Sequence, residues 1–205
     1  MTEITIVWIA LPFFMGFVSY LLPQLARFLS LVITLASASY AWYIFRETAP
    51  LELQLLNHFG VSLAVDQLSG FFILTNALVT AAVIFYCWGS RRTAFFYMQA
   101  IILHGSVNAT FICADFISLY VALEVISIAA FLLITYPRTD KAIWVGLRYL
   151  FISNTAMLFY LVGAVLVYQA HHSFYFGGLR GAPPEAVALI FLGLLVKGGI
   201  FVSGL

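Results

Sequence analysis

The chain has 205 residues, of which 64% are hydrophobic and 8% are charged, and its formal net charge is +1. A soluble domain carries about 25% charged residues, so this composition excludes an ordinary water-soluble globule and indicates lipid as the solvent. The near-neutral balance also excludes a nucleic-acid-binding protein, which would show basic clusters. We therefore expect an all-α protein that crosses the membrane several times.

Seven segments are long and apolar enough to cross a bilayer, which takes about 20 such residues. The first begins near Met1, but it lacks a basic region and contains Glu3, so we interpret it as a span and not as a signal peptide. The sixth is longer than a bilayer needs, so we expect it to tilt or to extend beyond the hydrocarbon. The predicted spans are Ile4–Leu22, Phe28–Phe45, Leu68–Trp88, Ala94–Cys113, Phe116–Tyr136, Ala142–Tyr168 and Ala186–Leu205.

The connection between the second and third spans has the pattern of a β-strand. From Val61 to Asp66, larger apolar residues alternate with small or polar ones, which is typical of a half-buried strand. A turn within Asn57–Gly60 would pair this strand with the residues before it. The sequence therefore predicts a short β-hairpin.

The Lys and Arg residues of the short connections predict how the chain is oriented, because cytoplasmic connections carry the excess of positive charge. The connections after the odd-numbered spans carry Arg27, Arg91, Arg92, Arg138 and Lys141, and those after the even-numbered spans carry Arg46 and Arg180. We therefore place the N-terminus and the hairpin on the periplasmic or lumenal side of a bacterial plasma membrane or a thylakoid membrane.

Two charged residues lie deep within the predicted spans, where a charge costs about 2.5–3.5 kcal/mol at the helix centre. At 1.5 Å per residue, Glu124 lies about 12 Å into the fifth span and Lys197 about 16 Å into the seventh. Both spans enter from the same face, so the two side chains are expected at a similar depth. An ammonium group near a carboxylate favours its ionised form. We predict a proton-transfer pair, with a purely structural ion pair as the alternative.

Other polar residues surround this pair in the sequence. Ser127 lies one turn beyond Glu124, and two glycines that follow Lys197 weaken its helix, a feature of transporter binding sites. His104 on the fourth span is a candidate proton relay, with a hydrogen-bonded packing role as the alternative. Arg148 is a weaker candidate, because its long side chain can reach the membrane surface and anchor there.

The sequence predicts no metal site and no redox cofactor. Cys87 and Cys113 fall at opposite faces of the membrane in this topology, so they are too far apart for a disulfide. No Cys or His spacing resembles a zinc, haem or iron–sulfur motif.

Three segments together resemble the N-terminal part of the antiporter-like membrane subunits shared by complex I (NADH:quinone oxidoreductase), membrane hydrogenases and Mrp-type Na+/H+ antiporters. They are "GVSLAVDQLSGFFILTNALV", then "ADFISLYVALEVISIAAFLLI" followed by "LRYLFISNTAMLFYLVGAVLVY", and "IFLGLLVKGGIFVSGL". The resemblance implies that Glu124 is the family's buried glutamate and Lys197 its partner lysine, and Arg148 stands where the family often has a lysine. Leu123 departs from the aromatic residue usual before the glutamate, and the segment after the lysine departs from the family pattern too.

The same resemblance implies a partial antiporter-like fold. Residues 1–93 would form an N-terminal three-helix segment with the outer hairpin, and residues 94–205 an incomplete first repeat carrying the buried charges. Family members have about twice as many helices in two inverted repeats. We therefore expect a fragment or a split subunit.

The predicted function is translocation of protons, or of cations and protons, within a larger assembly. The expected partners are other membrane subunits, the lipid bilayer, H+ and in some assemblies Na+. Any NAD(P)H:quinone oxidoreductase chemistry would belong to partner subunits. Two alternatives stay open: a structural or assembly subunit without its own ion path, and a subunit of an inorganic-carbon uptake complex.

Overall fold

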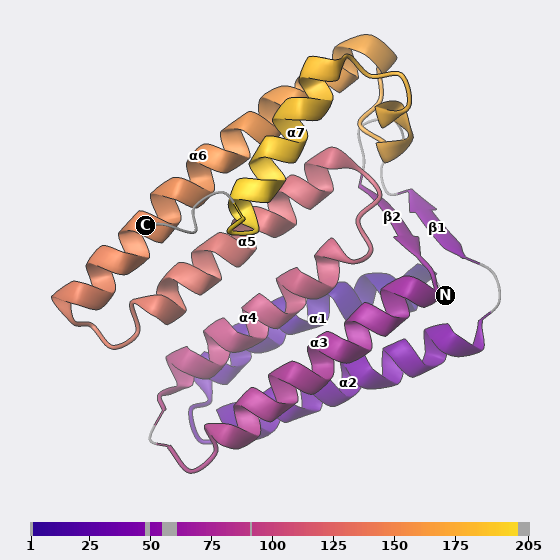
Figure 1. The fold of residues 1–205 in the computed structure, drawn as a ribbon. Coiled ribbons are helices and arrows are strands. Elements are labelled where there is room, and N and C mark those ends of the chain that lie inside the picture. Colours follow the sequence, from indigo (N-terminus) through magenta and orange to yellow (C-terminus); the bar gives the residue numbers. More distant parts are fainter. Residues whose placement is uncertain (1, 48–49, 55–60, 91, 201–205) are drawn as a thin grey trace. The chain divides into compact units, whose positions relative to one another are not determined.

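The computed structural model describes residues 2–47, 50–54, 61–90 and 92–200, which form seven α-helices and one two-stranded sheet (Figure 1). The expected architecture, mainly helical with a small β element, is confirmed. In chain order the elements are α1 (Thr2–Leu21), α2 (Ala26–Arg46), β1 (Leu51–Gln54), β2 (Ser62–Val65), α3 (Gln67–Tyr86), α4 (Ala94–Thr110), α5 (Phe116–Ile134), α6 (Asp140–His171), the 3-10 helix η2 (Phe176–Leu179) and α7 (Pro184–Lys197).

Five helices of the described chain, α1, α2, α3, α5 and α6, are long and apolar enough to cross a membrane. α4 has 17 residues and α7 has 14 described residues. These two helices therefore measure about 26 and 21 Å at 1.5 Å per residue. α6 has 32 residues and is about 48 Å long by the same rise, more than the roughly 30 Å of hydrocarbon in a bilayer. The expectation that the sixth span exceeds the bilayer thickness agrees with this length.

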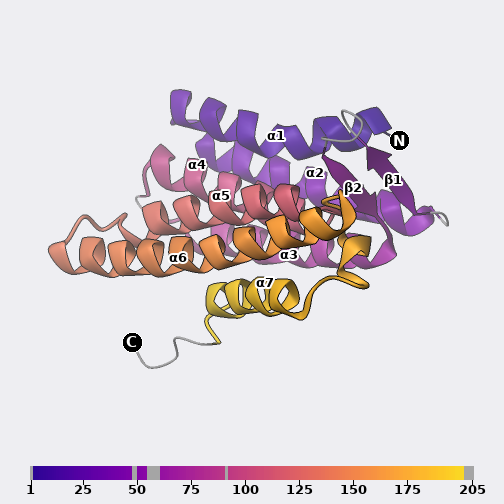
Figure 2. The same ribbon diagram turned by 90° about the horizontal axis from the view of Figure 1, so that it is seen from above.

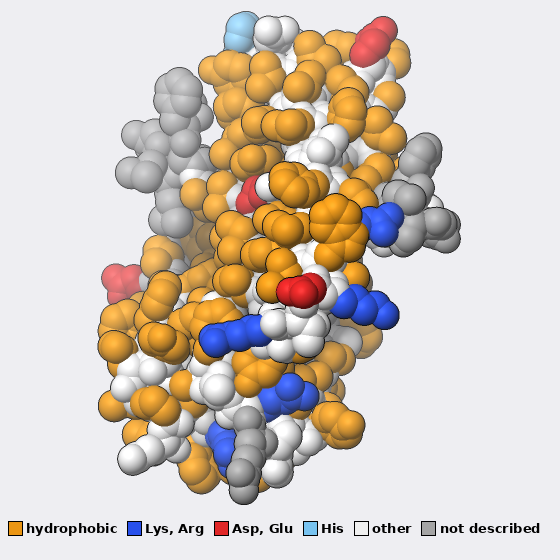
Figure 3. All heavy atoms as spheres, turned by 90° about the vertical axis from the view of Figure 1, so that its left-hand side faces the viewer, with side chains coloured by type: hydrophobic (Ala, Val, Ile, Leu, Met, Phe, Trp, Pro, Cys, Tyr) orange, Lys and Arg blue, Asp and Glu red, His pale blue; other side chains and the backbone are white. Residues whose placement is uncertain are grey.

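Large apolar side chains are exposed along the helices. Leu21 is 74% exposed, and Phe14 and Phe151 are each 68% exposed. Figure 3 shows a face on which hydrophobic side chains predominate and charged ones are few. Exposure of such apolar surface to water would cost roughly 25 cal/mol of free energy per Å². In a bilayer the same side chains face hydrocarbon, so the chain is an integral multi-pass membrane protein.

The chain divides into two compact units. The first comprises residues 1–53 and 63–112 and contains α1 to α4 with most of the two strands. The second comprises residues 54–62 and 113–205 and contains α5, α6, η2 and α7. The predicted division after residue 93 concerns the repeat organisation of the family and stays a prediction.

In the first unit, α1 packs against α4 and α2, and α2 packs against α3. Gly105 of α4 allows close approach to α1, because a Cβ atom there would lie 2.6 Å from Cβ of Pro12. Trp8 of α1 stacks on Tyr40 of α2 with ring centroids 4.1 Å apart. Small residues at helix contacts and a few polar links are the usual basis of packing in lipid, where burial of apolar surface contributes little.

The two strands pair with each other, as the hairpin prediction required. In β2, Leu63 and Val65 are buried, whereas Ser62 and Ala64 are partly exposed, so the predicted alternation is present. Val61 lies outside the strand and is 40% exposed. The predicted turn at Asn57–Gly60 lies outside the described residues.

The second unit is held together by close contact of α6 and α7, which lie side by side in Figures 1 and 2. A Cβ atom on Gly193 of α7 would lie 2.7 Å from the carbonyl oxygen of Ala156, and one on Gly163 of α6 would lie 2.7 Å from that of Ala186. Each helix therefore offers a glycine to the backbone of the other. Beside them, the hydroxyl of Tyr160 donates to the carbonyl oxygen of Phe116 at 3.0 Å and ties α6 to α5.

The end of α7 corrects the predicted seventh span. The span was expected to continue to Leu205, but the helix ends at Lys197 and residues 198–200 are not helical. The rest of the predicted span, residues 201–205, lies outside the described residues. Gly199 has φ +79°, and the N–H groups of Gly199 and Ile200 donate to the carbonyls of Val196 and Leu195 at 3.1 Å each. This is a Schellman motif, which closes a helix with a left-handed glycine. The glycines after Lys197 therefore end the helix, whereas the sequence had suggested only that they weaken it.

Candidate functional site

Lys197 brings the end of α7 to the middle of α5. Its ammonium nitrogen donates to the carbonyl oxygen of Leu123 at 2.9 Å and also to the hydroxyl of Ser127. Lys197 is half-buried at the last position of its helix, where a cation interacts favourably with the helix dipole. The charge is thus compensated by polar groups of one turn of a neighbouring helix.

Glu124 lies on this same turn of α5, between the two groups that Lys197 contacts. Its side chain is half-buried. Among the described residues, the ammonium donates to Leu123 and Ser127 and not to the Glu124 carboxylate. The structure therefore brings the two charged residues to one turn of α5 without a direct hydrogen bond between them.

Two serines extend the contact from α5 to α6. The hydroxyls of Ser127 and Ser153 lie 2.9 Å apart, and both side chains are buried, at 0% and 4% exposed. The Ser127 hydroxyl also lies 3.0 Å from the Leu123 carbonyl oxygen. Lys197, Ser127 and Ser153 form a continuous chain of hydrogen-bonding groups across three helices.

A hollow of about 140 Å³ lies beside this chain. Ser153 and Tyr149 of α6 line it together with Lys197 and Gly199. One water molecule occupies about 30 Å³ in the liquid, so the hollow has room for several waters with polar partners. The end of Lys197 therefore borders a space that water can enter.

His104 belongs to a separate polar cluster in the first unit. Its Nδ1 lies 3.1 Å from the Thr80 hydroxyl, and its Nε2 lies 2.9 Å from Ser37 Oγ and 3.1 Å from Asn108 Nδ2. The Asn76 amide donates to Asn108 Oδ1 at 2.8 Å. His104 is 1% exposed. These contacts join α2, α3 and α4, and both ring nitrogens of His104 have partners there.

Arg148 is exposed on α6 and lies outside the cluster around Lys197. Exposure suits the anchoring role that the sequence favoured for it. Asn154, farther along the same helix, is also exposed. Neither side chain lines the hollow beside Lys197.

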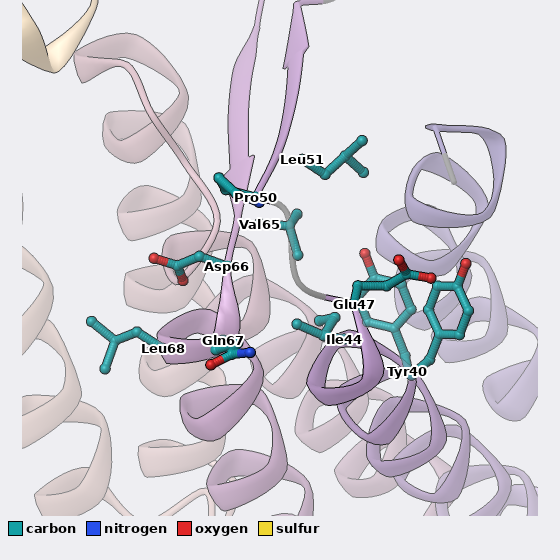
Figure 4. Close-up of a pocket in the computed structure, with 10 residues that line it drawn as sticks. Tyr40, Ile44, Glu47, Pro50, Leu51, Val65, Asp66, Gln67 and Leu68 are labelled. Atoms are coloured by element: carbon teal, nitrogen blue, oxygen red, sulfur yellow. The ribbon is translucent and has the colours of Figure 1, made fainter.

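A larger hollow, of about 320 Å³, lies in the first unit, where α2 ends and α3 begins (Figure 4). Tyr40, Glu47 and Asp66 contribute polar groups to it.

No group of three or more His, Cys, Asp or Glu residues able to hold a metal occurs among the described residues. Of the two cysteines, Cys87 is buried and Cys113 is partly buried. Burial raises the pKa of Cys113, which lies between α4 and α5, to about 12.

Asp115 is a buried carboxylate that was not among the residues expected from the sequence. It caps α5 by accepting from the backbone N–H of Ser118 at 2.7 Å, and its other oxygen accepts from the N–H of Ser62 at 2.8 Å. It is 4% exposed. An Asp directly before an apolar run is the available signal for a helix N-cap. The second contact has no local signal in the sequence.

These features define a multi-pass membrane protein with one lysine and one glutamate brought to the same turn of a helix inside the bundle. The family model described as NADH:quinone oxidoreductase/Mrp antiporter, TM, matches residues 113–203, the segment that carries both residues.

Known proteins with similar sequences or structures are also named as antiporter or quinone oxidoreductase subunits, or are chains of complex I. The chain is 26% identical over 156 residues to a Na(+)/H(+) antiporter subunit of Alkalihalophilus pseudofirmus, covering 70% of this chain and 32% of that protein. It is 29% identical over 157 residues to an NADH-quinone oxidoreductase subunit of Desulforudis audaxviator, covering 69% and 31%. A chain of respiratory complex I from Thermus thermophilus has a TM-score of 0.72 and 26% identity, covering 97% of this chain and 43% of that one.

These findings show that the chain is similar to the antiporter-like membrane subunits of complex I and Mrp assemblies, as its motifs implied. The chain spans about a third of the length of these two curated relatives. The matched proteins are named as subunits of larger assemblies.

Proposed function

We propose that the chain acts in ion translocation, as a proton- or cation/proton-translocating part of a complex I-like or Mrp-like assembly. In this proposal Glu124 and Lys197 exchange protons as a coupled pair. The observation that carries it is the contact of the Lys197 ammonium with the turn of α5 that holds Glu124. Ionisable residues within membrane helices are rare, and they commonly mark ion pathways.

The geometry supports a pair whose separation can change. Lys197 is the last residue of α7, and a glycine turn follows it. Its ammonium already has two neutral acceptors on α5. Movement of the ammonium from these acceptors to the nearby carboxylate would exchange one set of favourable interactions for another. Such an exchange alters how tightly each group holds a proton.

The test is proton transport by the assembled complex in membrane vesicles, followed with a pH-sensitive dye. We expect Glu124→Gln and Lys197→Met each to reduce transport at least about tenfold, with normal amounts of assembled complex, because each removes one titrating member of the pair. Glu185→Gln and Lys141→Met are matched controls, since both residues are exposed near helix starts. These controls should transport normally.

Normal transport by Glu124→Gln or Lys197→Met would overturn the proposal. With normal assembly, that result would favour a structural or assembly subunit. Bicarbonate uptake that depends on Glu124 while proton transport does not would favour the inorganic-carbon alternative.

We further propose that the N-terminus faces the periplasmic or lumenal side, and that other membrane subunits, lipid, H+ and in some assemblies Na+ are the partners. The support is the distribution of Lys and Arg among the connections. Single cysteines placed at Gln24 and at Ser173, in the described connections after α1 and after α6, test the orientation. An impermeant maleimide added to intact cells should label only the second. Labelling of the first alone would reverse the topology.

A further inference from the structure

We infer that Ser127 is a positioning residue that holds the Lys197 ammonium away from Glu124, with Ser153 as its support. The inference rests on the proposed function, because it assigns the acceptor for one state of the proposed pair. It starts from the observed partners of Lys197, which are a serine hydroxyl and a backbone carbonyl on the turn that carries Glu124.

The donor and acceptor capacity of the Ser127 hydroxyl shows how it can hold the Lys197 ammonium. A serine hydroxyl has one hydrogen to donate and two lone pairs that accept. The Ser127 hydroxyl donates its hydrogen to the Leu123 carbonyl oxygen at 3.0 Å, so its two lone pairs accept from the Lys197 ammonium and from the Ser153 hydroxyl, 2.9 Å away. Ser127 thus offers one lone pair to the ammonium, while Ser153 holds the same hydroxyl from α6.

Ser153 connects this chain to the hollow. It lies on α6, opposite Ser127, and it lines the space of about 140 Å³ beside Lys197. With its hydrogen donated to Ser127, its oxygen lone pairs can accept from a water in that space. Ser127 is 0% exposed and does not line the hollow, so bulk solvent does not replace its hydroxyl if it is removed.

The charged and titratable groups around Lys197 are few. α5 contributes Glu124 and α6 contributes Tyr149, which lines the same hollow. The other charged residue described on α7, Glu185, lies in its first turn, at the opposite end from Lys197. Glu124 is therefore the anionic competitor of Ser127 for the ammonium.

Removal of the serine acceptor should shift the Lys197 ammonium toward the Glu124 carboxylate. In Ser127→Ala, the ammonium loses its hydroxyl partner and is drawn to Glu124, where it gives up its proton less readily. We expect the alkaline limit of proton transport by the assembled complex to shift upward by about one pH unit, the effect of one lost hydrogen bond to a charged donor. Ser153→Ala should give a smaller shift in the same direction.

Thr155→Ala is the matched control on α6. The Thr155 hydroxyl is exposed and donates to the carbonyl of Phe151 on its own helix at 2.8 Å. Its loss should leave the pH profile unchanged. A Ser127→Ala complex that assembles and shows the wild-type pH profile would overturn the inference, as would an equal shift in Thr155→Ala.

A second measurement covers the case in which Ser127→Ala does not assemble. The infrared band of the protonated Glu124 carboxyl, identified by its absence in Glu124→Gln, is compared between the wild type and Ser153→Ala. We expect the band to appear only at lower pH in Ser153→Ala, because the ammonium spends more time beside the carboxylate. An unchanged band would overturn the inference. Normal transport by Glu124→Gln would instead overturn the proposed function, so the two failures are distinguishable.

Discussion

The His104 cluster of the first unit and the Lys197 site of the second both place polar groups among apolar helices. The two sites satisfy these groups with different kinds of partner. Around His104, both ring nitrogens and the Asn108 amide are bonded to side chains of α2, α3 and α4. Around Lys197, a charged group at the end of a helix is held by neutral acceptors beside a carboxylate and a hollow.

We interpret this difference as one between a role in packing and a proposed role in transport. A buried network whose members are all paired stabilises one arrangement, because any movement leaves polar groups without partners. A cation with neutral acceptors and a nearby anion can exchange one set of partners for the other. We therefore interpret His104 as a packing residue first, and its relay role stays a prediction.

The largest effect on stability should come from His104→Ala. It leaves Thr80 and Ser37 without their ring partner and opens a cavity, so we expect a loss of about 3 kcal/mol in unfolding free energy. Thermal unfolding of the purified protein in detergent measures it, with His171→Ala, at an exposed position, as the control. Lost proton transport with unchanged stability would instead assign His104 to the relay.

Gly193→Ala should come next, because it acts on the contact that positions α7. The added Cβ would lie 2.7 Å from the Ala156 carbonyl oxygen and 2.8 Å from Tyr160 Cβ, so the helices must separate. Overpacking of this kind costs about 2 kcal/mol. Gly89→Ala is the control, since a Cβ there meets nothing within 4 Å. Equal unfolding temperatures for the two variants would contradict the close packing of α6 and α7.

Asp115→Ala should cost about 1.5 kcal/mol, because it removes both the cap of α5 and the bond to the Ser62 N–H. Chemical denaturation in mixed micelles measures this change. Asp115→Asn keeps one acceptor oxygen, so it can retain one of the two contacts and should cost less. A loss no greater than that of Asp66→Ala, which removes an exposed cap, would show that the Ser62 contact adds nothing.

The smallest effect should be the pH dependence contributed by Asp66. The backbone N–H and hydroxyl of Ser69 donate to this carboxylate at 2.7 Å each and lower its pKa below the ordinary value of 3.8. A lowered folded pKa means that the stabilisation is complete above about pH 5 and is lost as the pH falls through the folded value. The cap is worth about 1 kcal/mol. Unfolding of Asp66→Asn between pH 3 and 7 should lack this acid-dependent component.

Much of the fold was predictable from the sequence, because hydropathy reports the solvent that a segment prefers. The apolar runs predicted seven helices, and the alternation at Leu63 and Val65 predicted a strand. The error at the end of α7 has a local cause: Gly199 takes a left-handed conformation, and composition alone does not distinguish a glycine that ends a helix from one that only weakens it.

The candidate site was predictable in its residues but not in its contacts. The position of a residue along an apolar run gives its approximate depth, so Glu124 and Lys197 could be named as charges inside the bundle. Periodicity does not give the rotation of one helix against another or the side-chain torsions. Only the tertiary structure therefore decided that Ser127 and the Leu123 carbonyl accept from Lys197, and that His104 is enclosed by partners on α2, α3 and α4.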